Sequence, residues 1–347
     1  MKRISFLLFT ILTGLSTYSN AQGISLFASP TDPAYLTDLS SQLTLRTFVS
    51  RKIIGYQVGK QGQTHEAEYS PNDVTSIGVG FTYKALGLNV NFRIPGLNND
   101  DDKYGKTKSL DLASYLYLRK FTIDAFAQIY EGHFLSDNDF VSARLSDKPY
   151  LVRPDLKTSF FGLNAHYIFN HTRFSYRAPF LQNEWQRQSA GSFLAGVNLH
   201  YTGASADSTI IPGITNPLAP EVTPESFSGT KTFSIGIDGG YAHTFVLKEH
   251  WFLTLAVMAG VGGNRTTLEY DYAGRDMSTF GLHLNGTGRA AVGYNSENWF
   301  FGAYYVNFLN RNFVPISSEA LWLQSANGLY RIVIAKRFAF REGRSSK

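Results

Sequence analysis

Three histidines each lie two residues from an asparagine: His166, His200 and His283, next to Asn164, Asn198 and Asn285. Side chains two residues apart share one face of a β-strand, so each histidine would have a polar partner beside it. Such a histidine could be the general base of a lipid hydrolase, if a nucleophile and an oxyanion donor lay within hydrogen-bond reach. No serine stands at the matching spacing. The pattern therefore favours a polar lining, with hydrolysis of the phospholipase or lipid A deacylase type as the alternative.

A second polar group lies in residues 170–189. Its candidate binding residues are Arg173, Arg177, Glu184, Gln186 and Arg187. This density of charge suits a plug, gate or binding element inside or beneath a barrel. It suits equally well an ion-pair network that fills an interior which water would otherwise occupy.

Further candidates fall on predicted water-facing positions elsewhere, and this set leans basic. They are Asp238, Arg289 and Arg331, together with the three histidines. Rings of Arg and Lys are the means by which pores favour anions. We therefore expect a small anionic solute as a partner.

Metal and nucleic-acid chemistry find little support. With no cysteine, no HExxH motif and no histidine pair in helical register, we expect no metal site and no cofactor. Asn98, Asp100 and Asp102 resemble the start of a calcium loop, but Lys103 stands where that loop needs glycine. The 32 basic and 27 acidic residues are scattered along the chain, which argues against nucleic acid as a partner.

The elements that position these side chains are strands, because most of the chain alternates apolar and polar residues with a period of two. No stretch after residue 21 is long and apolar enough to cross a bilayer as a helix. About twelve strands are predicted, at residues 42–57, 74–84, 86–94, 107–118, 120–131, 157–169, 190–203, 230–247, 250–265, 279–294, 298–309 and 327–340. The expected fold class is all-β, a transmembrane antiparallel β-barrel.

The ends of the chain support a membrane barrel over a water-soluble sandwich, which would show the same alternation. Lys2 and Arg3 precede an apolar run and small residues that end at Ala21, which is typical of a secretory signal peptide. We expect residues 1–21 to be this signal, 22–41 a periplasmic segment, 42–340 the barrel and 341–347 a basic tail.

Bacterial barrels alternate short periplasmic turns with longer outer loops. Short turns are predicted near residues 84–85, 119–120, 248–249 and 295–297, and long segments at 95–106, 132–155, 203–229, 270–277 and 310–325. This alternation holds throughout only if residues 170–189 do not cross the membrane. We therefore predict a non-spanning insertion there, on the periplasmic side or folded into the lumen.

Four segments resemble the DUF4421 family of uncharacterised Bacteroidetes proteins. They are Tyr69-Ser70-Pro71-Asn72, the residues Gly78 to Phe81 with Tyr83 and Lys84, Ala127 to Phe134 (AQIYEGHF) and Phe174 to Phe193 (FSYRAPFLQNEWQRQSAGSF). The resemblance covers nearly the whole chain after residue 21. It implies a secreted outer-membrane β-protein of that bacterial group and carries over no catalytic residue.

Together these observations favour an outer-membrane barrel without enzymatic activity, either a narrow channel or a solute-binding or assembly barrel. The expected partners are outer-membrane lipid and the barrel-assembly machinery, because Tyr330, Ile332, Ile334, Phe338 and Phe340 alternate as a closing strand. The basic tail after Phe340 departs from barrels that end directly on phenylalanine.

Overall fold

The computed structural model describes residues 30–60, 66–72, 75–84, 86–94, 100–136, 150–211, 226–270, 276–316 and 319–339. The predicted signal peptide, residues 1–21, and the basic tail, residues 341–347, lie outside the described residues. Both therefore stay predictions.

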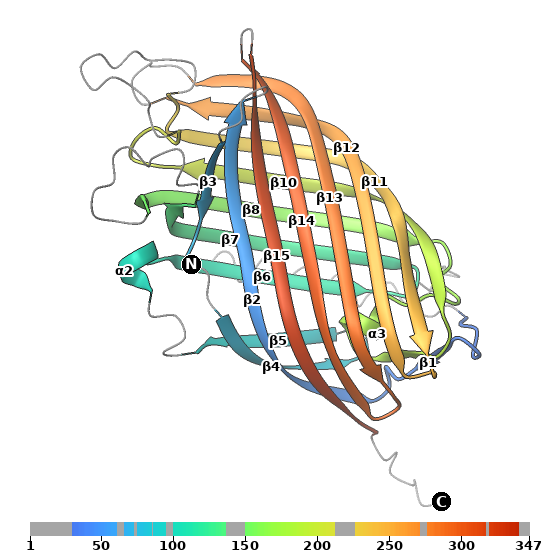
Figure 1. The fold of residues 1–347 in the computed structure, drawn as a ribbon. Helices are drawn as coiled ribbons and strands as arrows, with labels where there is room; N and C mark the ends of the chain where they lie inside the picture. The colour runs from blue at the N-terminus through green and yellow to red at the C-terminus, as the bar shows by residue number, and fades with distance from the viewer. Residues whose placement is uncertain are drawn as a thin grey trace, which may run out of the picture.

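One antiparallel sheet forms the wall of the molecule (Figure 1). In the described part of the chain its strands are β2 (Leu43–Lys60), β3 (Glu66–Ser70), β4 (Thr75–Tyr83), β5 (Leu86–Arg93), β6 (Lys108–Tyr117), β7 (Phe121–Leu135), β8 (Val152–Ile168), β10 (Ala190–Ser205), β11 (Gly229–Leu247), β12 (Trp251–Glu269), β13 (Met277–Asn295), β14 (Trp299–Ile316) and β15 (Glu319–Phe338). Four short elements lie beside it: β1 (Leu36–Asp38), α2 (Asp101–Tyr104), α3 (Arg177–Phe180) and β9 (Glu184–Gln186).

The sheet closes into a barrel because β15 pairs with β2 along nearly its whole length. The closed circuit runs through β2, β3, β7, β8 and β10 to β15. β4 pairs with the first half of β2, β5 pairs with β4, and β6 pairs with β7. These three strands extend the wall outside the closed circuit.

Alternation along each strand separates an apolar outer face from a polar inner face. On β11, for example, Phe233, Ile235 and Ile237 are exposed, whereas Thr232, Ser234 and Asp238 are buried. An apolar surface of this kind, wrapped around a closed hydrogen-bonded wall, is the arrangement that lets strands cross a bilayer. The chain is a transmembrane antiparallel β-barrel.

Exposed aromatic residues gather at one end of the wall. They include Tyr83, Phe169, Trp251, Trp299 and Phe338, each within two residues of a strand terminus. Aromatic rings at the level of lipid headgroups form such belts in membrane barrels.

Among the described residues, no helix has the length and apolar character needed to cross a membrane.

The twelve predicted strands all coincide with strands of the wall, which confirms the expected fold class. Nine of them belong to the closed ten-strand circuit of the described residues, and β4, β5 and β6 lie outside it. Two details differ. The short strand β3 was not predicted, yet it joins β2 to β7 and completes the circuit. The predicted long loop at 310–325 is wrong, because β14 continues to Ile316 and β15 begins at Glu319. The two strands remain paired up to Ile316 and Glu319, and this pairing gives hydrogen-bond partners to backbone N–H and C=O groups that a loop would leave without them.

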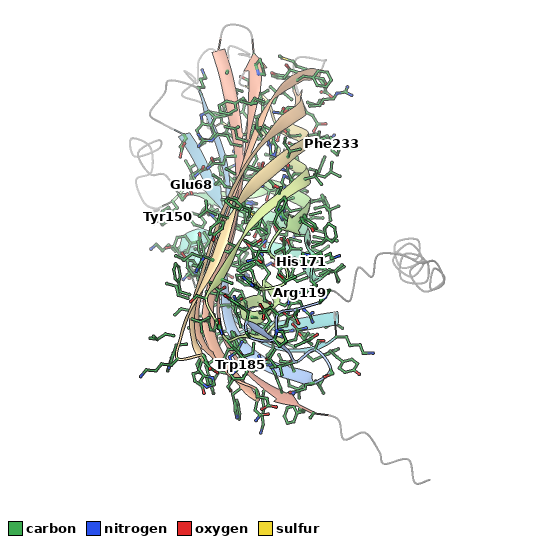
Figure 2. The ribbon with its side chains drawn as sticks, turned by 90° about the vertical axis from the view of Figure 1, so that its right-hand side faces the viewer. Glu68, Arg119, Tyr150, His171, Trp185 and Phe233 are labelled. Carbon is green, nitrogen blue, oxygen red and sulfur yellow. The ribbon has the colours of Figure 1, made fainter. Side chains whose placement is uncertain are left out.

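The prediction for residues 170–189 is confirmed. This segment contains α3 and β9 and does not cross the wall. It lies at the barrel end that carries the short turns, which we call the plug end, and we call residues 170–189 the plug. Its Asn183 Nδ2 donates to the carbonyl oxygen of Lys84, and Trp185 Nε1 donates to that of Glu249, both over 2.8 Å. Figure 2 places Trp185 at the lower end of the molecule.

Candidate functional site

A buried ion-pair cluster holds the plug. Glu184 lies between two guanidinium groups, with Arg119 Nη1 at 2.7 Å from Oε2 and Arg177 Nη1 at 2.9 Å from Oε1. Ser175 Oγ also donates to Glu184 Oε2. All four side chains are buried, so the charges must be paired here to offset their loss of hydration. The cluster therefore fixes the plug in one arrangement.

The other predicted plug residues have different surroundings. Gln186 is buried, and its Oε1 accepts from the Ser175 backbone N–H at 3.1 Å. Arg173 pairs with Asp32 over 3.1 Å, and Arg187 pairs with Glu249 over 2.9 Å, both on the exposed underside. The predicted periplasmic segment contributes β1, which pairs antiparallel with β9. The plug is thus a small unit that contacts both the N-terminal segment and the turns.

Above the plug, Arg289 of β13 crosses the lumen to Asp124 of β7. It donates to that carboxylate and to the hydroxyl of Tyr117. Its guanidinium also lies over the rings of Tyr176 and Phe180, at 5.4 and 5.7 Å from their centroids. Burial raises the pKa of Tyr176 to about 12, so this hydroxyl stays protonated at neutral pH. Aromatic rings and a paired cation together close the lumen over α3.

A second polar group joins strands β8, β10, β11 and β13. His166 Nε2 lies 3.1 Å from Asp238 Oδ1, and the other oxygen of Asp238 accepts from Asn285 at 3.1 Å and from Asn198 at 3.4 Å. Thr122 Oγ1 lies 3.4 Å from His166 Nδ1. Hydroxyl, imidazole and carboxylate stand in the order of a hydrolase triad. All three side chains are buried, at 2%, 1% and 7% exposure, which keeps a substrate from reaching them, and we interpret them as a structural network.

The other two predicted histidines lie nearer the middle of the lumen. His200 Nε2 and Asn164 Oδ1 are 2.9 Å apart, and His283 Nδ1 and Asn312 Oδ1 are also 2.9 Å apart. Ser234 donates to the same Asn312 oxygen at 2.7 Å rather than to a histidine. In the residues described, no hydroxyl group is hydrogen-bonded to His200, and the arrangement lacks an activated nucleophile.

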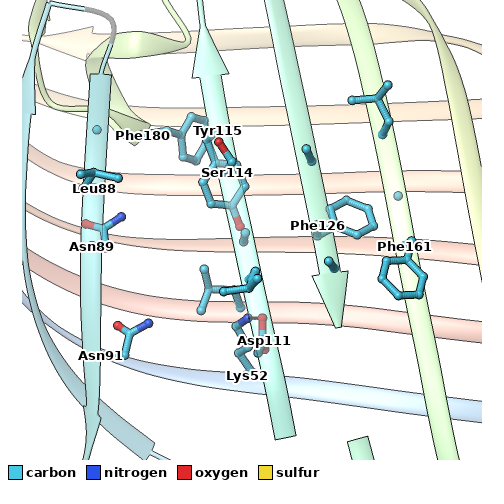
Figure 3. A pocket seen from close by; sticks show the side chains of 18 of the residues that line it. Lys52, Leu88, Asn89, Asn91, Asp111, Ser114, Tyr115, Phe126, Phe161 and Phe180 are labelled. Atoms are coloured by element: carbon cyan, nitrogen blue, oxygen red, sulfur yellow. Dashed lines mark ion pairs between the residues drawn. The ribbon is translucent and has the colours of Figure 1, made fainter. Parts of the chain in front are cut away.

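A cavity of about 670 Å³ opens beside this network, between β5 and β6 (Figure 3). Its floor is formed by the plug residues Phe180 and Leu181. Volumes of this size are typical of sites for small ligands. Its polar lining includes Arg46, Lys52, Asn89, Asn91, Asp111 and Arg331.

The cations of this cavity are paired unequally. Lys52 of β2 forms an ion pair with Asp111 of β6. All the acceptors of Arg46 among the described residues are neutral, and they include Gln182 Oε1 of the plug and the carbonyl oxygen of Phe81 at 3.0 Å. The guanidinium of Arg331 has no hydrogen-bond or carboxylate partner among the described residues and lies 4.0 Å from the ring centroid of Phe48. Both arginines are buried, at 6% and 7% exposure, with Nε unpaired.

The structure therefore divides the predicted site residues among several places. Arg177, Glu184 and Gln186 lie together in the plug. His166 lies with Asp238 in the polar group that joins β8, β10, β11 and β13. Of the predicted set, His200 and Arg331 line the cavity. The remaining predicted residues, placed above, are His283 and Arg289 in the lumen and Arg173 and Arg187 on the underside.

Three cavity residues were missed at the sequence level: Arg46, Lys52 and Asp111. Their signal was the alternation itself. Arg46 and Lys52 share one face of β2 with the buried Phe48. Asp111 alternates with the exposed Leu110 and Leu112 on β6. Continuing the face assignment along these two strands would have placed all three in the lumen.

No group of three or more His, Asp or Glu side chains that could hold a metal ion occurs in the ranges the structure describes.

Comparison with solved structures finds other membrane barrels at low similarity. The outer membrane protease OmpT from Escherichia coli has a TM-score of 0.38 and 8% identity, covering 87% of this chain and 98% of its own. The translocator domain of the autotransporter NalP from Neisseria meningitidis has a TM-score of 0.31 and 8% identity, covering 96% and 98%. The P. putida toluene transporter TodX has a TM-score of 0.25 and 8% identity, covering 90% and 94%.

No curated protein matches the sequence. A family model, by contrast, matches residues 30–338, which is most of the chain and includes the plug and every strand of the wall. The chain belongs to the family described as a domain of unknown function, DUF4421.

Proposed function

We propose that this protein is an outer-membrane binding barrel whose lumen holds a small anionic group between Arg46 and Arg331. The predicted signal peptide and the lipid-facing apolar surface support an outer-membrane location, with lipid and the barrel-assembly machinery as partners. The observation that carries the binding role is a pair of buried guanidinium groups that line one cavity, neither of them with a carboxylate partner among the described residues.

The physical argument rests on the cost of buried charge. A guanidinium removed from water loses hydration that only a paired anion restores well. Two other buried cations of this interior have a carboxylate, since Arg289 has Asp124 and Arg119 has Glu184. The buried Arg337 at the plug end has none among the described residues, but it donates three hydrogen bonds to carbonyl and amide oxygens. Arg331 is buried to a similar degree and has neither a carboxylate nor a hydrogen-bond acceptor among the described residues. A ligand phosphate or carboxylate would supply the missing charge and accept paired hydrogen bonds.

A binding role is better supported than an open channel because side chains close both ends of the lumen in the described residues. The plug fills one end. At the other end a buried apolar cluster crosses the interior, with Tyr56, Tyr69, Leu135, Phe227 and Leu268 among its members. An ion crossing this cluster would lose its hydration, which an apolar constriction opposes.

The lipid-hydrolase alternative has less support. The Thr122–His166–Asp238 group lies away from the cavity, and His200, which does line it, has an amide rather than a hydroxyl as its partner. A substrate in the cavity would therefore meet no activated nucleophile.

Ligand-dependent stability tests the proposal. The purified barrel is unfolded by urea in detergent with and without inorganic phosphate, whose binding should stabilise it by about 2.7 kcal/mol at a hundredfold excess over Kd. Arg331→Gln and Arg46→Gln should remove most of this gain. Arg51→Gln is the matched control, because Arg51 lies on the lipid-facing side of β2, the strand that carries Arg46. This variant should keep the stabilisation by phosphate.

The difference between these variants is decisive, because phosphate also stabilises proteins nonspecifically and would do so equally in all of them. Equal phosphate gains in Arg331→Gln and Arg51→Gln would contradict the binding site. A large steady conductance of the unmodified barrel in planar bilayers would favour the channel instead.

A further inference from the structure

The barrel wall is interrupted between β5 and β6. β5 pairs with β4 along one edge and β6 pairs with β7 along one edge. In the described residues no ladder joins β5 to β6, although the two strands are neighbours in the wall (Figure 1). The circuit closes through β3 instead, which reaches β7 only at Tyr69 and Ser70. Below β3, and counting only the described residues, β5 and β6 each have one edge without a strand partner.

These free edges lie within the lipid-facing band. Leu88 and Val90 of β5 are 53% and 54% exposed, and Leu110 and Leu112 of β6 are 52% and 58% exposed. Backbone N–H and C=O groups at an open edge find no water in hydrocarbon, so lipid-exposed edges are strongly disfavoured. Natural sheets cover or pair such edges. This opening therefore calls for an occupant that presents polar atoms to the edges and apolar atoms to the lipid.

The cavity passes around the edge of β6. Its lining includes Ala113 and Tyr115, which alternate to the lumen side, and Leu112 and Ser114, which alternate to the lipid side. It continues over the outer face of β7 at Ala125 and Ala127. In Figure 3 the side chains of β5 and β6 border the opening, with Lys52 and Asp111 behind it. One continuous hollow thus joins the arginines to the lipid-facing surface.

The outer part of this hollow is a shallow apolar trough. Small side chains form its base, since Ser114 is paired with Ala125 across the β6–β7 ladder. Larger side chains stand beside it, with Leu163 next to Ala125 and Phe161 next to Ala127 across the β7–β8 ladder. Such a surface can take an extended hydrocarbon chain by apolar contact. The inner part, in contrast, carries the guanidinium groups of Arg46 and Arg331, neither of which has a carboxylate partner among the described residues.

We propose that the opening between β5 and β6 is a lateral entrance for an anionic amphiphile from the outer membrane. The acyl chain lies in the outer trough, and the carboxylate or phosphate head enters to meet Arg46 and Arg331. This inference rests on the proposed binding function and adds the ligand class and its route. The Lys52–Asp111 ion pair crosses from β2 to β6 behind the opening and limits how far the head can pass.

Cross-linking the opening tests the route. The sequence has no cysteine, so Asn89→Cys in β5 and Ala113→Cys in β6 introduce a unique thiol pair beside the opening. Thiol-reactive cross-linkers of increasing length then hold the strands at set separations. The control is Ile237→Cys with Val261→Cys, exposed cross-strand neighbours of β11 and β12 that are already paired.

The probe is a single-chain fatty acid, presented in vesicles that contain the reconstituted barrel. Native mass spectrometry measures the fraction of protein that carries it after a fixed time. We expect the shortest cross-link at β5–β6 to lower loading at least tenfold, with loading recovering as the linker lengthens. The β11–β12 cross-link should leave loading unchanged, and Arg331→Gln should lower it without any cross-link.

Loading that is equally fast with the opening cross-linked would overturn the lateral entrance. Stabilisation by phosphate through Arg331 without any fatty-acid loading would overturn the ligand class and leave the proposed binding function in place. Loss of both effects would overturn the proposed function together with this inference.

Discussion

The two halves of this barrel wall treat their inward side chains differently. In the complete wall, which we define as β8 and β10 to β15, inward polar residues such as Thr232 and Asn264 keep only 1% and 3% exposure. In the interrupted wall, β4 to β6, the inward residues Asn89 and Ala113 are exposed. One region seals the lumen and the other admits contact from outside.

Ladder length accounts for this difference. β11 and β12 pair over all of Gly229–Leu247, so every residue of β11 has a cross-strand partner. Among the described residues, β5 pairs over eight residues and on one edge. Proteins commonly place ligand-binding segments in their less stable regions, because such segments must open. The comparison therefore suggests that rigidity resides in the complete wall and access in the interrupted one.

Removing the carboxylate partner of Arg289, a buried cation of the complete wall, should have the largest effect. Asp124→Ala leaves Arg289 buried without a carboxylate, and loss of one partner of a buried pair costs about 3–5 kcal/mol. Urea unfolding of the reconstituted barrel measures this loss. Asp111→Ala is the comparison at the opening, where it removes the ion pair to the partly exposed Lys52 and the hydrogen bonds from Gln128 and Tyr130, and we expect a smaller cost of about 1–2 kcal/mol. Equal losses would mean that the two regions are equally rigid.

A pair of glycines gives a smaller, sharper contrast. An alanine Cβ at Gly262 of β12 would lie 2.0 Å from the carbonyl oxygen of Ile235, so Gly262→Ala must displace backbone. We expect it to cost about 1–3 kcal/mol. At Gly87 of β5 the nearest atoms are Arg46 Nη2 and Thr82 Oγ1, both at 3.3 Å and both on side chains, and Gly87→Ala should be nearly neutral. Comparable unfolding midpoints for the two variants would contradict a tighter fit in the complete wall.

Much of this fold could be predicted from the sequence because strand alternation is local. The twelve long strands and the non-spanning plug both follow from periodicity and from the order of short and long connections. Closure through β3 could not be predicted in this way. Five residues carry too little pattern, and their pairing with both β2 and β7 depends on contacts far apart in the chain.

The candidate site was predictable only in part for the same reason. Arg331 was assigned to the water-facing set by alternation, and continuing that assignment along β2 would have added Arg46. Whether an inward arginine has a carboxylate partner depends on which side chains face it across the lumen, and among the described residues Arg46 and Arg331 have none. Which acid meets which base, as Asp111 meets Lys52 rather than an arginine, depends on strand positions that one sequence does not reveal.

The smallest expected effect concerns the bridge behind the opening. If the Lys52–Asp111 pair limits entry, Lys52→Met should speed fatty-acid loading about two- to fivefold, which corresponds to a partly exposed ion pair worth about 0.5–1 kcal/mol. Arg51→Met, on the lipid side of the same strand, should leave the rate unchanged. Asp111→Asn separates the two roles open to Lys52, because it breaks the bridge and keeps the cation. Faster loading in both variants supports a barrier, whereas slower loading in Lys52→Met alone would make Lys52 a third contact for the anionic head.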